Sequence, residues 1–192
     1  IEEALKSLMN LELKRKFHKH VTGRRLQREL PAERWEKSYK FAFVREPYAW
    51  MYSWYRFRQR DALKDPSSEY HRRYTGNISF NEFVRTFSSK ELMLKQSDVI
   101  SAPNGELLVD FVGRYETLQS DFDTICERLN IPRQKLSWVN VTESKASTED
   151  LLDTTGIKTI NDYFSQDFEM FEYIKRTDSL TLQRPVKNST SL

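Results

Sequence analysis

Residues 41–53 read FAFVREPYAWMYS, and this stretch decides the fold. Residues 39–44 are short, apolar and rich in side chains that favour strands, so they predict a buried β-strand. Pro47 suits the first position of an α-helix, which predicts a helix that begins directly after Arg45 and Glu46. A helix N-terminus at the end of a strand offers free backbone N–H groups that favour an anion.

Helices and strands alternate on both sides of this stretch. The spacing of apolar residues and of capping residues predicts further helices over residues 1–11, 22–30, 31–35, 79–87, 117–129 and 157–173. Residues 16–21 are expected to form a short strand, residues 61–77 a polar loop, and residues 98–114 a β-hairpin with its turn at Asn104-Gly105. This alternation favours an α/β layer fold with a partly parallel sheet, in which ligands bind beyond the carboxyl ends of the strands.

The composition fits one compact domain of 192 residues and excludes several classes of protein. There are 31 basic and 28 acidic side chains, and the net charge of +3 does not by itself imply a nucleic-acid partner. Cys126 is the only cysteine, which excludes an intrachain disulfide, and its place on an apolar helix face predicts a core residue. No run of about 18 apolar residues is present, so the sequence predicts no membrane span.

Arg45 and Ser53 are the candidate ligands for an anion in the decisive stretch. Arginine offers a planar fork of N–H donors to phosphate oxygens, and a serine hydroxyl adds a further donor. Ser53 lies nearly two turns into the predicted helix, so the pair could bind a terminal phosphate. The alternative is structural, with Arg45 in an ion pair and Ser53 facing the helix packing.

The pattern Val44-Arg45-x-Pro47-x-x-x-x-x-Ser53 resembles the 3′-phosphate-binding motif of the sulfotransferases that use 3′-phosphoadenosine-5′-phosphosulfate (PAPS). The carbohydrate and heparan 2-O-type branch and its bacterial relatives are the most similar. Three further stretches resemble segments of this family in their order and spacing, namely residues 20–22, 110–129 and 161–173.

The resemblance implies a fold, a reaction and roles for two residues. The fold is a P-loop-NTPase-like three-layer α/β sandwich with a mostly parallel central sheet, formed by residues 1–173 and followed by a polar tail over residues 174–192. The reaction moves a sulfuryl group from PAPS to a hydroxyl acceptor, which is a saccharide in the branch named. Arg45 and Ser53 then bind the 3′-phosphate of the nucleotide.

The resemblance also implies a polar loop that closes over the nucleotide. Asn140, Ser144 and Lys145 lie in the corresponding segment, although each of them could equally be solvated. Two positions depart from the family pattern. Glu46 stands where Asp or Asn is usual, and Trp50 stands where a second arginine is frequent.

Sulfuryl transfer needs a base for the acceptor hydroxyl, and histidine titrates near neutrality. His18 and His20 would share one face of the predicted strand. The resemblance points to His20 as the base, and His18 is the second candidate. Two alternatives stay open: a structural histidine with a backbone partner, and a zinc site, for which the sequence offers no third ligand. We therefore expect no metal, and we expect His71, in the polar loop, to be solvated.

The family holds the 5′-phosphosulfate in a P-loop-like turn, and none of the five glycines of this chain sits in such a setting. The helix predicted over residues 1–11 starts without a cap and resembles the helix that follows this turn. We therefore expect the missing strand and loop to lie upstream of Ile1. The chain alone should then bind the 3′-phosphate end of PAPS better than it transfers sulfate.

A second hypothesis is a non-catalytic module that binds a nucleotide or a nucleic acid through residues 48–60. Aromatic and basic side chains are mixed there, and such mixtures stack bases and follow a phosphate backbone. However, one helix must place many of these aromatic residues in the core, and the weak net charge argues against nucleic acid. The lack of disulfides favours a cytoplasmic location, with the Golgi lumen as the alternative if a membrane anchor lies upstream.

Overall fold

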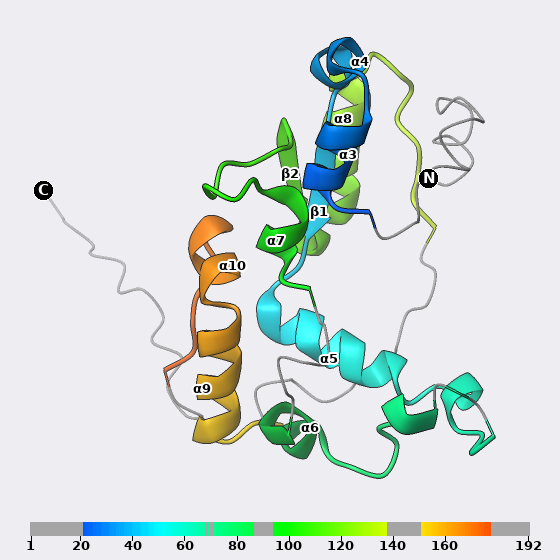
Figure 1. The fold of residues 1–192 in the computed structure, drawn as a ribbon, viewed down its shortest axis with the longest axis vertical. Coiled ribbons are helices and arrows are strands. Elements are labelled where there is room, and N and C mark those ends of the chain that lie inside the picture. Colours follow the sequence, from blue (N-terminus) through cyan, green and yellow to red (C-terminus); the bar gives the residue numbers. More distant parts are fainter. Residues whose placement is uncertain (1–20, 68, 70, 87–93, 138–150, 178–192) are drawn as a thin grey trace, which may run out of the picture. The chain divides into compact units, whose positions relative to one another are not determined.

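The computed structural model describes residues 21–67, 69, 71–86, 94–137 and 151–177. Figure 1 shows its helices and strands in chain order. They are α3 (Gly23–Glu29), α4 (Ala32–Lys37), β1 (Phe41–Val44), α5 (Pro47–Phe57), η1 (Asp61–Leu63), η2 (His71–Arg73), α6 (Phe80–Thr86), α7 (Gln96–Ile100), β2 (Phe111–Arg114), η4 (Tyr115–Thr117), α8 (Leu118–Arg128), α9 (Thr154–Tyr163) and α10 (Ser165–Met170), where η marks a 3-10 helix.

The chain divides into two compact units, which are described separately below. Unit 1 comprises Ile1–Glu46, Leu92–Thr142 and Glu169–Phe171. Unit 2 comprises Pro47–Glu91, Glu143–Phe168 and Glu172–Leu192.

Unit 1 is built around the parallel strands β1 and β2, which lie side by side in Figure 1. Val44, at the end of β1, pairs with Arg114, at the end of β2. Helix α8 packs against β2, and α3 packs against α7. The parallel register therefore brings the residues that follow both strands to the same edge, with Arg45 after one strand and Tyr115 after the other.

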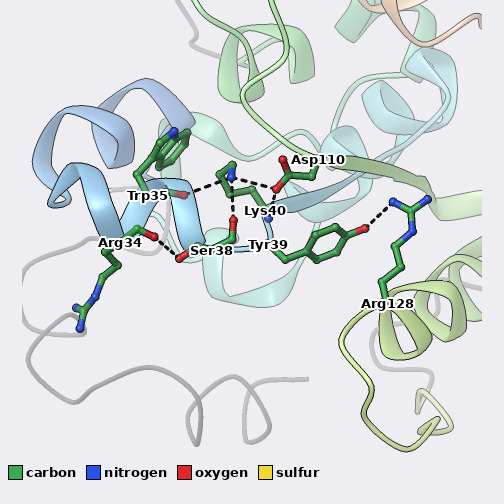
Figure 2. A network of polar contacts seen from close by, with 7 residues as sticks. All are labelled: Arg34, Trp35, Ser38, Tyr39, Lys40, Asp110 and Arg128. Carbon is green, nitrogen blue, oxygen red and sulfur yellow. Dashed lines mark hydrogen bonds and ion pairs between the residues drawn. The ribbon is translucent and has the colours of Figure 1, made fainter.

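Polar side chains fix the beginnings of both strands, as Figure 2 shows. The N–H of Lys40 donates to Asp110 Oδ2 at 2.7 Å, and Lys40 Nζ lies 3.0 Å from the same oxygen. Lys40 Nζ also donates to the carbonyl of Ser38 at 2.8 Å, and Arg128 Nη1 donates to the Tyr39 hydroxyl at 3.0 Å. The hydrogen bond from the Lys40 N–H lowers the pKa of the Asp110 carboxyl.

Unit 2 contains helix α5 packed against α6 and α9. The buried apolar side chains of these three helices are Pro47, Tyr48, Met51, Tyr55, Phe80, Phe83, Val84, Ile157 and Ile160. The two buried tyrosines also satisfy their hydroxyls: Tyr48 donates to Asn161 Oδ1 at 2.7 Å, and Tyr55 donates to the carbonyl of Ile78 at 2.8 Å. Burial raises the pKa of the Tyr55 hydroxyl.

Hydrogen bonds confirm the helix starts that the sequence predicts. Thr22 Oγ1 accepts from the N–H of Arg25 at 3.4 Å and caps α3. Ser79 Oγ accepts from the N–H of Glu82 at 3.1 Å at the start of α6. Pro47 is the first residue of α5, as its fixed φ angle predicts.

The predicted β-hairpin over residues 98–114 is wrong. Helix α7 occupies its first part, and β2 pairs in parallel with β1 rather than with a neighbouring strand. The turn is retained, because Gly105 has φ 85° and an isolated bridge joins Ser101 to Leu107. β-Branched residues at 99 and 100 favour a strand, but burial of Ile100 within α7 outweighs that preference.

The helix predicted over residues 157–173 is in fact two helices. Asp153 Oδ1 accepts from the N–H of Gly156 at 2.8 Å and starts α9 three residues before Ile157, the predicted first residue. The second helix, α10, begins directly after Phe164. Because Phe164 and Phe168 are both buried, the apolar spacing continues across the break and hides it from the sequence.

Other predictions stand as follows. Cys126 is fully buried, as predicted, and the described residues between 61 and 77 form a loop that holds the two short helices η1 and η2. The helix predicted over residues 1–11 lies outside the described residues, and the strand predicted over residues 16–21 lies outside them except for its last residue. The parallel pairing of two strands confirms a mixed α/β structure, whereas the three-layer arrangement and the domain boundary at residue 173 stay predictions. Within the part of the chain that the structure describes, no helix is long and apolar enough to cross a membrane.

Candidate functional site

Arg45 is the first residue after β1, and one side chain binds both of its backbone polar groups. The N–H of Arg45 donates to Gln96 Oε1 at 2.8 Å, and Gln96 Nε2 donates to the carbonyl of Arg45, also at 2.8 Å. Gln96 is the first residue of α7 and is only 8% exposed. Its amide therefore fixes the backbone of Arg45 at a point where the strand pairing has already ended at Val44.

The side chain of Arg45 lies over an aromatic ring. Its Cζ is 4.3 Å from the centroid of Tyr115, the first residue after β2. The Arg45 Nε is buried and has no hydrogen-bond partner among the described residues, and in the same part of the chain no carboxylate forms an ion pair with Arg45. Arg45 Nε is one of several such buried donors among the described residues, and its place at the carboxyl end of a parallel strand makes it a candidate to bind a ligand oxygen.

The backbone N–H of the next residue, Glu46, is bound by a side chain that follows β2. The N–H of Glu46 donates to Glu116 Oε1 at 2.8 Å. Helix α5 then begins at Pro47, and its first turn contains no acidic side chain. Arg45 is thus a partly buried cation on a fixed backbone, stacked on a ring, which suits binding of an anion.

The other predicted ligands are not joined to Arg45 by the structure. Ser53 is half-buried in α5, which belongs to unit 2, whereas Arg45 belongs to unit 1. The remaining predicted site residues lie outside the described residues; they are His18, His20, Asn140, Ser144 and Lys145. Their predicted roles stay predictions.

Two further polar residues have structural contacts. Arg114 Nη2 donates to the carbonyl of Phe171 at 2.6 Å, which supports a structural role for this arginine. His71 is half-buried rather than solvated, since its Nδ1 lies 3.1 Å from the carbonyl of Leu63 and its ring stacks on Tyr74. The expectation of a solvated His71 is therefore wrong.

The stretch 48–60 has a buried part and an exposed part, and Arg56, Phe57 and Arg60 belong to the exposed part. Tyr48 and Tyr55 are buried, and the guanidinium of Arg58, which is 5% exposed, lies over the rings of Trp54 and Phe83. These side chains stabilise the unit and are not displayed for stacking on bases. Burial removes these side chains from any base-stacking surface, and the weak net charge still argues against nucleic acid for the exposed remainder of the stretch.

No cluster of His, Cys, Asp or Glu that could hold a metal ion occurs among the described residues.

The chain was compared with known proteins. The model of the sulfotransferase family matches residues 3–174. The chain belongs to the sulfotransferase family. Comparisons with curated proteins and with solved structures gave no match.

Sequence reasoning about this sulfotransferase missed the three residues that hold the end of β1. Tyr115 and Glu116 follow β2 directly, and parallel strands end at a common edge, so correct pairing of the strands would have identified them. Gln96 had no such signal, because it lies 51 residues from Arg45 in a segment for which the sequence predicted no helix or strand.

Proposed function

We propose that this sulfotransferase takes its sulfuryl group from PAPS and passes it to a saccharide hydroxyl. The observation that carries the proposal is the buried Nε of Arg45, which has no partner among the described residues and stands at the end of a parallel strand. A phosphate oxygen would supply the missing acceptor, and the guanidinium fork suits a terminal phosphate. The residues present therefore fit the 3′-phosphate of the nucleotide.

Arg45 and Ser53 are proposed to bind that 3′-phosphate, and Asn140, Ser144 and Lys145 to close over the nucleotide. PAPS supplies an activated sulfuryl group on its 5′-phosphate. The task of the chain is then to bind the nucleotide, to orient the acceptor hydroxyl and to remove its proton. His20 is proposed as the base, with His18 as the second candidate, because histidine accepts a proton near neutral pH.

The nucleotide proposal is tested by calorimetric titration of the full chain with 3′-phosphoadenosine 5′-phosphate (PAP). Arg45→Ala removes a charged donor to the phosphate and is expected to raise the Kd by about 10- to 100-fold. Arg28→Ala is the matched control, since it removes the same charge from an exposed position in unit 1. Equal affinity of the parent and Arg45→Ala for PAP would refute the assignment.

The acceptor and the base are tested by transfer assays on the natural full-length protein. Polysaccharides with free hydroxyls should accept labelled sulfate from PAPS, and a simple phenol should not. His20→Ala is expected to lower kcat by about 10²- to 10⁴-fold while the Kd for PAP stays the same, because general-base catalysis contributes that much. An unchanged kcat in His20→Ala, together with a loss in His18→Ala, would transfer the role to His18.

A further inference from the structure

We propose that Gln96 is a positioning residue, which holds the Arg45 backbone so that the guanidinium meets the 3′-phosphate. This inference rests on the proposed function, because it assigns Gln96 to the same nucleotide site. Gln96 itself is not expected to touch the nucleotide. It acts through two hydrogen bonds to Arg45, each 2.8 Å long.

The two bonds run in opposite directions and lie on either side of one Cα atom. Gln96 Oε1 accepts from the Arg45 N–H, and Gln96 Nε2 donates to the Arg45 carbonyl. A backbone N–H only donates and a carbonyl only accepts, so the orientation of the amide is determined by its partners. Among neutral side chains of this length, only an amide offers a donor and an acceptor together. The main-chain conformation of Arg45 is therefore fixed from both ends.

Burial makes this restraint firm. Gln96 is 8% exposed, so water competes little for its amide, and hydrogen bonds in such surroundings are strengthened. Gln96 opens α7, and Ser97 and Ile100 of the same helix are also buried. The amide is therefore carried by an element that packs in the core of unit 1.

The fixed backbone directs the side chain toward a single orientation. From that backbone, the guanidinium reaches the Tyr115 ring, with Cζ 4.3 Å from the ring centroid. The N–H of the next residue, Glu46, is bound by Glu116 at 2.8 Å. The orientation is thus set by side chains from two separate segments, residue 96 and residues 115–116. Of these residues, only Gln96 binds the backbone of Arg45.

A positioning role predicts an effect that depends on the 3′-phosphate itself. The test measures the affinity of the full chain for PAP and for adenosine 5′-phosphate, which lacks the 3′-phosphate. Gln96→Met has a similar shape but cannot form either hydrogen bond. It is expected to weaken PAP binding about tenfold and to leave the affinity for adenosine 5′-phosphate within about twofold of the parent value.

The chain offers a matched control at Gln119, whose amide also donates to one backbone carbonyl and accepts from one backbone N–H. Gln119 Nε2 donates to the carbonyl of Gln134 at 3.1 Å, and Gln119 Oε1 accepts from the N–H of Leu136 at 2.8 Å. Gln119→Met should therefore change neither affinity. In an Arg45→Ala background, Gln96→Met should have no further effect on PAP binding, because the group that it positions is absent.

The outcomes separate this inference from the proposed function. If Arg45→Ala keeps the parent affinity for PAP, the nucleotide assignment fails and the role of Gln96 fails with it. Suppose that Arg45→Ala lowers the affinity for PAP, but Gln96→Met lowers the affinities for PAP and adenosine 5′-phosphate equally or changes neither. Only the positioning role is then overturned. Should Gln96→Met not fold, as judged by far-UV circular dichroism, Gln96→Asn serves instead, because its side chain is too short to make both bonds.

Discussion

A methyl group added at Gly113 is expected to strain the pairing of β1 with β2. Gly113 lies opposite Phe43, and a Cβ at this position would be 2.5 Å from Phe43 Cε1, 2.7 Å from Cδ1 and 3.2 Å from Asp121 Cβ. Non-bonded carbons prefer about 3.5–4.0 Å, so the ring has to move by about 1 Å. Overpacking of this kind costs about 1–3 kcal/mol, so Gly113→Ala should lower the free energy of unfolding by about that amount.

The assay is urea unfolding of the full chain, followed by tryptophan fluorescence, with the midpoint and the m value fitted together. Gly113→Ala should lower the midpoint and leave m unchanged. Phe43→Leu removes the ring atoms that the new methyl would meet, so Gly113→Ala should cost less than half as much in that background. A full-sized cost in the Phe43→Leu background, or no cost in the parent, would show that the predicted clash with Phe43 is wrong.

Two further predictions concern unit 2. Ile160→Ala should lower the free energy of unfolding by about 2–5 kcal/mol, because Ile160 is 0% exposed and its loss leaves a cavity; a change below about 1 kcal/mol would contradict this. Hydrogen bonds from Asn81 and from the N–H of Gly156 lower the pKa of the Asp153 carboxyl. The stability that the ionised carboxylate contributes is therefore present above the ordinary pKa and is lost as pH falls through the lowered value. Asp153→Asn keeps a capping side chain, so its stability deficit against the parent, measured by urea unfolding, should be largest above about pH 5 and should shrink below about pH 3. A deficit that is constant with pH would argue against an ionised role for Asp153.

Local patterns predicted the elements whose signals lie within a few residues. The strand before Arg45 and the helix start at Pro47 follow from apolar content and from a fixed φ angle. The caps at Thr22 and Ser79 follow from side chains that reach three residues along the chain. In each of these cases the physical cause and its sequence signal occupy the same short segment.

The remaining features depend on contacts between distant segments. Helix α7 forms where strand-favouring residues predicted a hairpin, because burial of Ile100 outweighs local preference. Gln96 also had no local signal, because its partner Arg45 is 51 residues away. For the candidate site, the motif identified Arg45, but Tyr115 and Glu116 could be found only from the parallel pairing of β1 with β2.

The hydrogen bonds that Gln96 and Glu116 make to the backbone of residues 45 and 46 affect how this region folds. Its hydrogen bonds span 51 and 70 residues of chain, so each requires a long loop to close before it can form. A peptide that covers only the strand and helix around Arg45 should therefore fail to reproduce the arrangement. Contacts of such long range slow folding and form together with the sheet. A ligand that binds Arg45 would then stabilise the whole of unit 1 against unfolding, and its affinity would report whether that unit has folded.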